Sequence, residues 1–187
     1  DYVSFLKKYS DYLIIEKPST WDNLSFMVEY QFGYMYGRYL LWNFVGKQND
    51  VQGRYDNLDG NWISGIDFVD EIHLGKGTQT NLTEDIKNNK GRNVYYFLPF
   101  LIGLIGLMYH AQKDLKSFYV LLVLFLFTSF ALKIFLNERP FEPRERDYAL
   151  VGSFYVFAIW IGFGVYAIYE IVAGYVKSKL VGPIVIA

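Results

Sequence analysis

Charged residues are absent from three long stretches in the second half of the chain. No Asp, Glu, Lys or Arg occurs in the 20 residues 93–112, the 16 residues 117–132 or the 22 residues 148–169. A helix needs about 20 mostly apolar residues to cross the hydrocarbon core of a bilayer. The pattern therefore predicts an all-α fold of polytopic transmembrane helices, with spans at about 94–112, 117–136 and 149–176. Small residues in the third span, Gly152, Ser153, Gly162 and Gly164, are expected to permit close helix packing.

A fourth apolar run, residues 180–187, has eight residues and is too short to cross a bilayer by itself. We interpret it as the start of another span, so that residues 94–187 form a transmembrane region. The chain begins at Asp1, without an initiator Met or a signal-peptide pattern. The sequence is therefore expected to be an interior fragment of a larger polytopic protein.

Residues 1–93 are too polar to cross a membrane, yet they are rich in aromatic side chains. Phe26, Tyr30 and Tyr34 follow each other at helical spacing, and Thr20 or Asp22 offers a helix cap before them. Because Tyr and Trp favour the water–lipid boundary, an interfacial helix is predicted near residues 26–45. Two interpretations remain open: the helix packs on the membrane core of the same protein, or it also contacts a lipid or an acceptor.

The distribution of charge predicts the orientation of the spans. The loops after the first and third spans are short and basic, which is typical of loops that face the cytoplasm. The loop between the second and third spans is neutral to acidic, and residues 1–93 contain 13 acidic and 10 basic residues. Both segments are therefore expected on the extracytoplasmic side. Lys133, near the end of the second span, is expected to snorkel outward or to pair with an acid of the following loop.

Amides and carboxylates are concentrated just after the aromatic helix. Residues 46–59 read GKQNDVQGRYDNLD, and Trp62 follows shortly afterwards. Such groups beside a Trp are typical of sites for hydroxyl-rich ligands, because bidentate hydrogen bonds are combined with an aromatic face. The segment is either a solvated turn region or a sugar- or phosphate-binding loop.

Composition excludes several other functions. The chain has no cysteine, which rules out disulfides and thiolate metal sites, and its two histidines lack the paired spacing of metal ligands. A net charge of −1 without a basic patch argues against nucleic-acid binding. No metal or other cofactor is expected.

The heptapeptide RERDYAL at residues 144–150 begins with four charges of alternating sign beside the third predicted span. Ionisable groups at the edge of a bilayer lose hydration and are usually retained for binding or pairing. Arg144 and Arg146 can each bind a phosphate or a carboxylate through two N–H groups, and Asp147 can cap the following helix. The alternatives are a network of ion pairs that fixes the loop and a phosphate clamp for a lipid-linked substrate.

Three blocks of sequence carry a resemblance to a known family: residues 34–53 (YMYGRYLLWNFVGKQNDVQG), residues 59–65 (DGNWISG) and residues 144–162. They closely resemble a bacterial family of large polytopic membrane proteins identified as protein O-mannosyltransferase-like, with a multi-span glycosyltransferase fold of the GT-C type. The resemblance covers most of the chain from about residue 30 to residue 164, in the same order. Lys47 stands where Arg is common in that family, and Gly37 where a bulky aromatic residue is common.

The resemblance implies an integral membrane enzyme of the bacterial inner membrane. It would transfer a sugar from a polyprenyl-phosphate donor to protein on the extracytoplasmic side. Enzymes of this type use an acidic catalytic residue in their first extracytoplasmic loop, which would precede Asp1. The expected partners are membrane lipid, the lipid-linked sugar donor, a protein acceptor and other membrane subunits.

Candidate substrate-binding residues follow from this interpretation. They are Arg144, Arg146, Asp147 and Tyr148 beside the donor phosphate, Arg38 as a second cation, and Asn43, Gln48, Asn49 and Asp50 for the sugar or the acceptor. The alternative function is a non-catalytic membrane subunit or scaffold of a larger envelope complex. In that case the same motifs serve packing and ion pairing.

Overall fold

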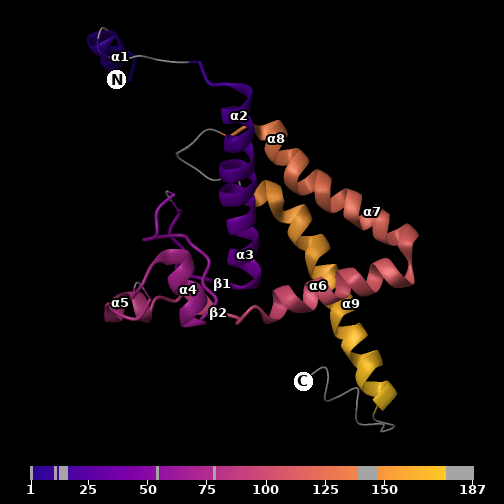
Figure 1. The fold of residues 1–187 in the computed structure, drawn as a ribbon. Coiled ribbons are helices and arrows are strands. Elements are labelled where there is room, and N and C mark those ends of the chain that lie inside the picture. The colour runs from indigo at the N-terminus through magenta and orange to yellow at the C-terminus, as the bar shows by residue number, and fades with distance from the viewer. Residues whose placement is uncertain are drawn as a thin grey trace.

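The computed structural model describes residues 2–10, 12, 17–53, 55–77, 79–138 and 147–175 (Figure 1). This part of the chain is mostly helical, as predicted, with a short antiparallel pairing of β1 and β2. The elements in chain order are α1 (Tyr2–Tyr9), α2 (Thr20–Phe26), η1 (Met27–Gly37), α3 (Arg38–Phe44), β1 (Gly46–Lys47), α4 (Asp67–Leu74), α5 (Glu84–Lys87), β2 (Asn93–Val94), α6 (Leu98–Lys113), α7 (Leu115–Leu126), η2 (Phe127–Ala131), α8 (Leu132–Leu136), η3 (Asp147–Leu150) and α9 (Val151–Tyr175).

The predicted aromatic helix is the continuous stretch α2–η1–α3, of which η1 is a π-helix. Its N-cap is Ser19 rather than Thr20 or Asp22, and the Asp22 carboxylate closes a capping box by accepting from the Ser19 N–H at 2.8 Å. The rings of Phe26 and Tyr30 stack at 5.1 Å, and those of Tyr30 and Tyr34 at 5.7 Å. The helical spacing read from the sequence therefore produces a ladder of stacked rings.

Two helical segments in the described part of the chain are long and apolar enough to cross a membrane, judged by length and composition. They are Leu115–Leu136, with 22 residues, and Tyr148–Gly174, with 27 residues. Both lie close to the predicted spans at 117–136 and 149–176. The predicted start of a further span at 180–187 lies outside the described residues.

The first predicted span, at 94–112, differs in the structure. Helix α6 has 16 residues, which corresponds to a rise of about 24 Å, against about 30 Å for a hydrocarbon core. The helix begins only at Leu98, because Val94 pairs with β1 and because Tyr96 and Phe97 have positive φ angles of 52° and 60°. The described part of the chain therefore contains two helices of spanning length where the sequence predicted three spans.

Helices α6 and α9 cross with their backbones in direct contact (Figure 1). A Cβ atom added at Gly106 would overlap the carbonyl oxygen of Trp160, and one added at Gly164 would overlap that of Ile102. The expected close packing at Gly164 is thus present, whereas Gly162 has no atom within 4 Å of an added Cβ. Close approach of two helices depends on such residues without side chains.

The aromatic core lies beside this crossing. Trp160, Phe157 and Val156 of α9 pack with Phe118 of α7 and are buried. The ring of Phe44, at the end of α3, lies 4.6 Å from that of Phe157. The aromatic helix therefore packs on the other helices of the same protein, and its additional contact with a lipid or an acceptor stays a prediction.

An ion pair closes the end of α8. The Nζ atom of Lys133 lies 2.5 Å from Oε2 of Glu138, and each side chain is only 2% exposed. This confirms the expectation that Lys133 pairs with an acid of the following loop. Gln31 of η1 donates to Asn137 at 3.1 Å and ties the same turn to the aromatic helix. Because both charges are removed from water, each needs the other as a partner.

We expect replacement of Gly106 or Gly164 by Ala to destabilise the protein by about 1–3 kcal/mol, because the added methyl group overlaps a backbone oxygen. Gly162→Ala is the matched control on the same helix and should be neutral or stabilising by up to about 1 kcal/mol, through its helix propensity. Thermal unfolding in detergent measures the difference. Equal melting temperatures for all three variants would contradict the backbone contact.

A second prediction concerns the buried ion pair. Lys133→Met should destabilise the protein by about 3–5 kcal/mol, because the Glu138 carboxylate is left buried without a partner. Adding Glu138→Met to the same variant removes the orphaned charge and should recover most of the lost stability. Denaturant titration of both variants checks this, and a single variant as stable as the double one would be inconsistent with burial of the pair.

Candidate functional site

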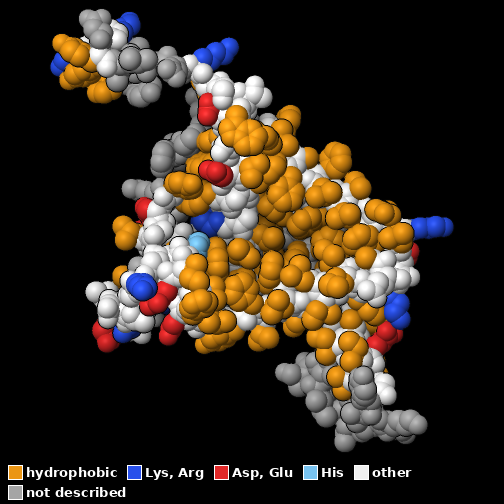
Figure 2. Space-filling view, viewed as in Figure 1, with side chains coloured by type: hydrophobic (Ala, Val, Ile, Leu, Met, Phe, Trp, Pro, Cys, Tyr) orange, Lys and Arg blue, Asp and Glu red, His pale blue; other side chains and the backbone are white. Residues whose placement is uncertain are grey.

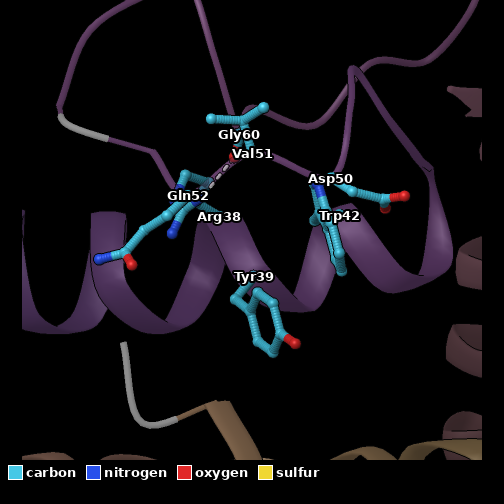
Figure 3. Close-up of a pocket in the computed structure, with 7 residues that line it drawn as sticks. All are labelled: Arg38, Tyr39, Trp42, Asp50, Val51, Gln52 and Gly60. Atoms are coloured by element: carbon cyan, nitrogen blue, oxygen red, sulfur yellow. Dashed lines mark hydrogen bonds between the residues drawn. The ribbon is translucent and has the colours of Figure 1, made fainter. Parts of the chain in front are cut away.

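A pocket of about 150 Å³ lies between α3 and the loop that follows β1 (Figure 3). It is formed where the last turns of the aromatic helix meet the amide-rich segment that the sequence singled out. Its lining residues are Arg38, Tyr39, Trp42, Asp50, Val51, Gln52 and Gly60. Two predicted binding residues, Arg38 and Asp50, therefore come together at one pocket.

Arg38 braces the loop against the helix. Its side chain is 6% exposed, its Nη1 donates to the Gly60 carbonyl, and its Nε donates to the Tyr34 carbonyl at 3.2 Å. The guanidinium carbon also lies 4.5 Å from the centre of the Tyr34 ring, a cation–π contact. Arg38 thus places a fixed positive charge at the pocket wall while holding the loop in position.

Tyr39 and Trp42 form an aromatic wall. Their ring centres are 5.2 Å apart with an interplanar angle of 21°, and the ammonium group of Lys47 lies 4.4 Å from the centre of the Trp42 ring. The indole Nε1 of Trp42 is buried and has no hydrogen-bond partner in the described part of the structure. An indole N–H that is buried usually finds an acceptor, so this donor stands out.

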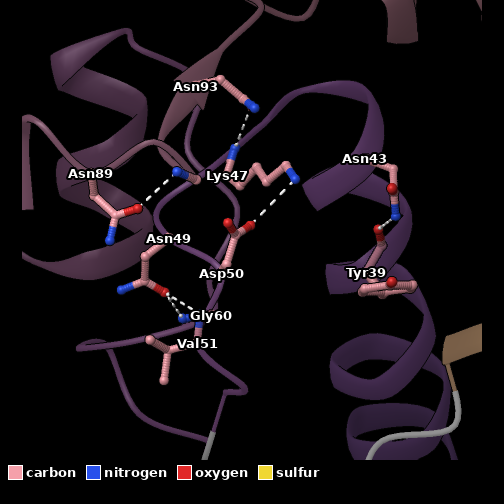
Figure 4. Close-up of polar contacts among 10 residues, drawn as sticks. Tyr39, Asn43, Lys47, Asn49, Asp50, Val51, Gly60, Asn89 and Asn93 are labelled. Carbon is pink, nitrogen blue, oxygen red and sulfur yellow. Dashed lines mark hydrogen bonds and ion pairs between the residues drawn. The ribbon is translucent and has the colours of Figure 1, made fainter.

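Asp50 stands at the rim of the pocket. Its carboxylate is 3.4 Å from the Lys47 ammonium group (Figure 4) and packs against the backbone of Gly91. In Figure 3 the carboxylate points away from Arg38. The exposed acid is therefore paired with a lysine at the rim rather than with the buried arginine.

The amides of Gln48 and Asn49 hold the loop together instead of lining the pocket. Gln48 accepts from the side chain of Asn61 at 3.2 Å, and Asn49 donates to Asp59 at 2.7 Å and accepts from the backbone N–H of Gly60 at 2.9 Å (Figure 4). Both side chains are buried. Their polar groups therefore make contacts within the protein, and the ligand contacts predicted for them stay a prediction.

Asn43 and Tyr148, among the described residues, do not line this pocket. Asn43 donates its amide to the Tyr39 carbonyl one turn earlier, at 2.8 Å. Arg144 and Arg146 lie outside the described residues. Asp147 begins η3, at the entry to the third predicted span, and the side chain of Tyr148 is exposed. The proposed phosphate clamp therefore stays a prediction.

The sequence interpretation missed Tyr39, Trp42 and Gln52 as pocket residues. Tyr39 and Trp42 lie within the interfacial helix predicted near residues 26–45, without a binding role assigned to them. A signal was present, because positions 38, 39 and 42 share one face of a helix that leads directly into the amide-rich loop.

A second polar cluster, formed by Asp70 and His73 of α4, holds residues 62–65 of the loop region. The carboxylate of Asp70 on α4 accepts hydrogen bonds from the backbone N–H of Ser64 at 2.7 Å, from the Ser64 hydroxyl at 2.8 Å and from the N–H of Gly65 at 2.9 Å. One turn later, the His73 ring stacks on Trp62 with centres 4.2 Å apart. Burial lowers the pKa of His73, and the nearby Asp70 carboxylate opposes that shift. The hydrogen bonds of the cluster thus centre on the Asp70 carboxylate, with the His73 ring stacked beside it.

Among the described residues, no group of three or more His, Asp or Glu side chains is arranged to hold a metal ion. Comparison of the chain with protein-family models finds no match, and comparisons with curated proteins and with solved structures find none either. The chemistry of the pocket therefore has to be argued from its own residues.

Because burial lowers the pKa of His73, its contribution to stability should depend on pH. Below about pH 6.5 the unfolded chain binds a proton at this histidine that the folded chain resists, so stability is retained at higher pH and lost as the pH falls. His73→Phe keeps an aromatic ring against Trp62 and should flatten this dependence. Melting temperatures between pH 5 and 8 check it, and identical pH profiles for both proteins would refute the assignment.

Proposed function

We propose that the chain is part of an integral-membrane glycosyltransferase that moves a sugar from a polyprenyl-phosphate donor to protein on the extracytoplasmic side. The resemblance to protein O-mannosyltransferase-like proteins suggests the reaction. The pocket at the end of the aromatic helix supplies a place for one of its substrates.

A membrane setting is supported by the surface of the helices. Hydrophobic side chains gather over α6, α7 and α9 in Figure 2, and charged side chains lie mainly around their edge. Val120, Val123 and Phe127, within the segment Leu115–Leu136, each have more than half of their surface exposed. A continuous apolar surface of this kind suits contact with lipid tails.

The combination of a guanidinium with two aromatic faces is the observation that favours ligand binding at the pocket. Arg38, Tyr39 and Trp42 line it together, and such a set suits an acceptor-rich ligand. Drug-sized ligands occupy pockets of about 300–1,000 Å³, so a volume of about 150 Å³ suits a single small unit. A sugar ring or a phosphate group of a lipid-linked donor meets both conditions.

In the proposed reaction, the acceptor hydroxyl attacks the anomeric carbon, and the bond from that carbon to the phosphate oxygen breaks. The hydroxyl proton passes to a carboxylate base, which the resemblance places before Asp1. Negative charge develops on the departing polyprenyl phosphate and needs cations nearby. Arg144 and Arg146 are the proposed phosphate ligands, with Arg38 as a second cation, so this chain would bind the donor rather than provide the base.

A non-catalytic scaffold is the second candidate, and the hydrogen bonding of the loop favours it. Arg38, Gln48 and Asn49 all use polar groups to hold the loop together. Such bracing serves a subunit whose role is to present a rigid surface. The two candidates differ in whether the pocket affects sugar transfer.

We expect Trp42→Phe to raise the KM for the donor about 2- to 10-fold, because the smaller ring removes part of the aromatic face that lines the pocket beside Arg38, and such a face contributes about 0.5–1.5 kcal/mol. The assay follows transfer of mannose from polyprenyl-phosphate mannose to extracytoplasmic proteins, in membranes that contain the full-length protein.

Trp21→Phe is the matched control, because Trp21 is exposed and does not line the pocket. Its KM should remain that of the unmodified protein. If Trp42→Phe also leaves transfer unchanged, the pocket does not bind the donor and the scaffold becomes the better account.

A further inference from the structure

Helix α4 presents an apolar face to the outside of the loop region. Phe68 is 72% exposed and Ile72 is 71% exposed, although both are large hydrophobic residues. They are four residues apart and therefore lie on the same face of the helix. Ile66, just before the helix, is also exposed. A polar helix at the surface of a soluble segment has no need for such a pair.

The rotation of α4 about its axis is fixed from the opposite side. Asp70 is buried and holds the backbone N–H groups of Ser64 and Gly65, and Leu74 is buried in the small core of the loop region. The carbonyl of Leu74 accepts from the Asn57 side chain at 3.0 Å. These contacts hold Asp70 and Leu74 on the inner side of α4, so Phe68 and Ile72 stay on its exposed face.

This exposed face continues toward the apolar helices. The ring of Tyr96 packs against Gly65, immediately before Ile66. The backbone N–H of Tyr96 donates to the Ser64 carbonyl at 3.2 Å. Two residues after Tyr96, helix α6 begins with an exposed stripe of hydrophobic side chains at helical spacing. The stripe consists of Leu98, Leu101, Ile105 and Met108. In Figure 2, hydrophobic side chains extend without a charged boundary across the start of α6.

The link between the two surfaces is a strained aromatic turn. Tyr96 and Phe97 both have positive φ angles, which bulky residues rarely adopt. Tyr96 remains more than half exposed in this conformation. Tyrosine is enriched where water meets lipid, because its ring is apolar and its hydroxyl is polar. The turn thus places Tyr96, a residue suited to the lipid–water boundary, between the apolar face of α4 and that of α6.

We propose that α4 lies in the lipid–water boundary, with Phe68 and Ile72 inserted beside the lipid-facing stripe of α6. This inference rests on the proposed membrane setting. Asp67 is exposed beside Phe68, and Glu71 is half-buried, so α4 itself carries no positive side chain that would attract anionic headgroups. The partner is therefore the apolar part of the lipid rather than its charge.

Spin labels test this directly, because residues 1–187 contain no cysteine, and any cysteine elsewhere in the full-length protein is first replaced by serine. Phe68→Cys and Ile72→Cys would be labelled separately in the full-length protein, in phosphatidylcholine nanodiscs. Oxygen, which concentrates in lipid, and a water-soluble nickel chelate serve as relaxing agents. Asn88→Cys, exposed just after α5, is the aqueous reference, and Val123→Cys, exposed on α7, is the lipid reference.

Oxygen accessibility should exceed nickel accessibility at positions 68, 72 and 123, with the ratio reversed at position 88. If position 123 behaves as lipid-exposed while 68 and 72 behave like 88, the inference about α4 fails and the membrane setting stands. If neither agent reaches 68 or 72, another part of a protein covers them and the inference also fails. An aqueous result at position 123 would overturn the membrane setting itself. The two labelled sites on α4 are read independently, so misfolding of one variant leaves the other decisive.

Discussion

The backbone contact between α6 and α9 is the constraint on which the remaining packing depends. Without side chains at Gly106 and Gly164 the two helices meet closely enough for Trp160 and Phe157 to be enclosed. Phe157 in turn receives Phe44 from the end of α3. The pocket wall is carried by the same short helix, so the position of a polar site is set by an apolar contact between two other helices.

The polar groups around the pocket differ in whether they have a hydrogen-bond partner within the protein. The loop is held by Arg38, Gln48 and Asn49, whose donors and acceptors meet partners inside the protein. Among the described residues, the buried indole N–H of Trp42 has no such partner. An unpaired buried donor is unfavourable, so this part of the wall is held less firmly than the loop.

Features that depend on neighbouring residues could be predicted from the sequence, and features that depend on distant contacts could not. The second and third apolar segments and the ring spacing on the aromatic helix follow from composition and periodicity, whereas for Lys133 the sequence left pairing and snorkelling open and the structure shows the pair. The late start of α6 follows from the pairing of Val94 with Gly46, 48 positions earlier, which no local pattern reveals. Gln48 and Asn49 were predicted as ligand contacts because a side-chain amide has the same sequence signature whether it binds a sugar or its own backbone.

The two-residue pairing of β1 with β2 brings the end of α3 next to the approach to α6. The segment between Lys47 and Asn93 leaves the helices and returns to the same place, so that the β1–β2 pairing acts as a tight connection between α3 and α6. A slip of one residue in the pairing would shift α6 against α3 and reverse which side chains face inward.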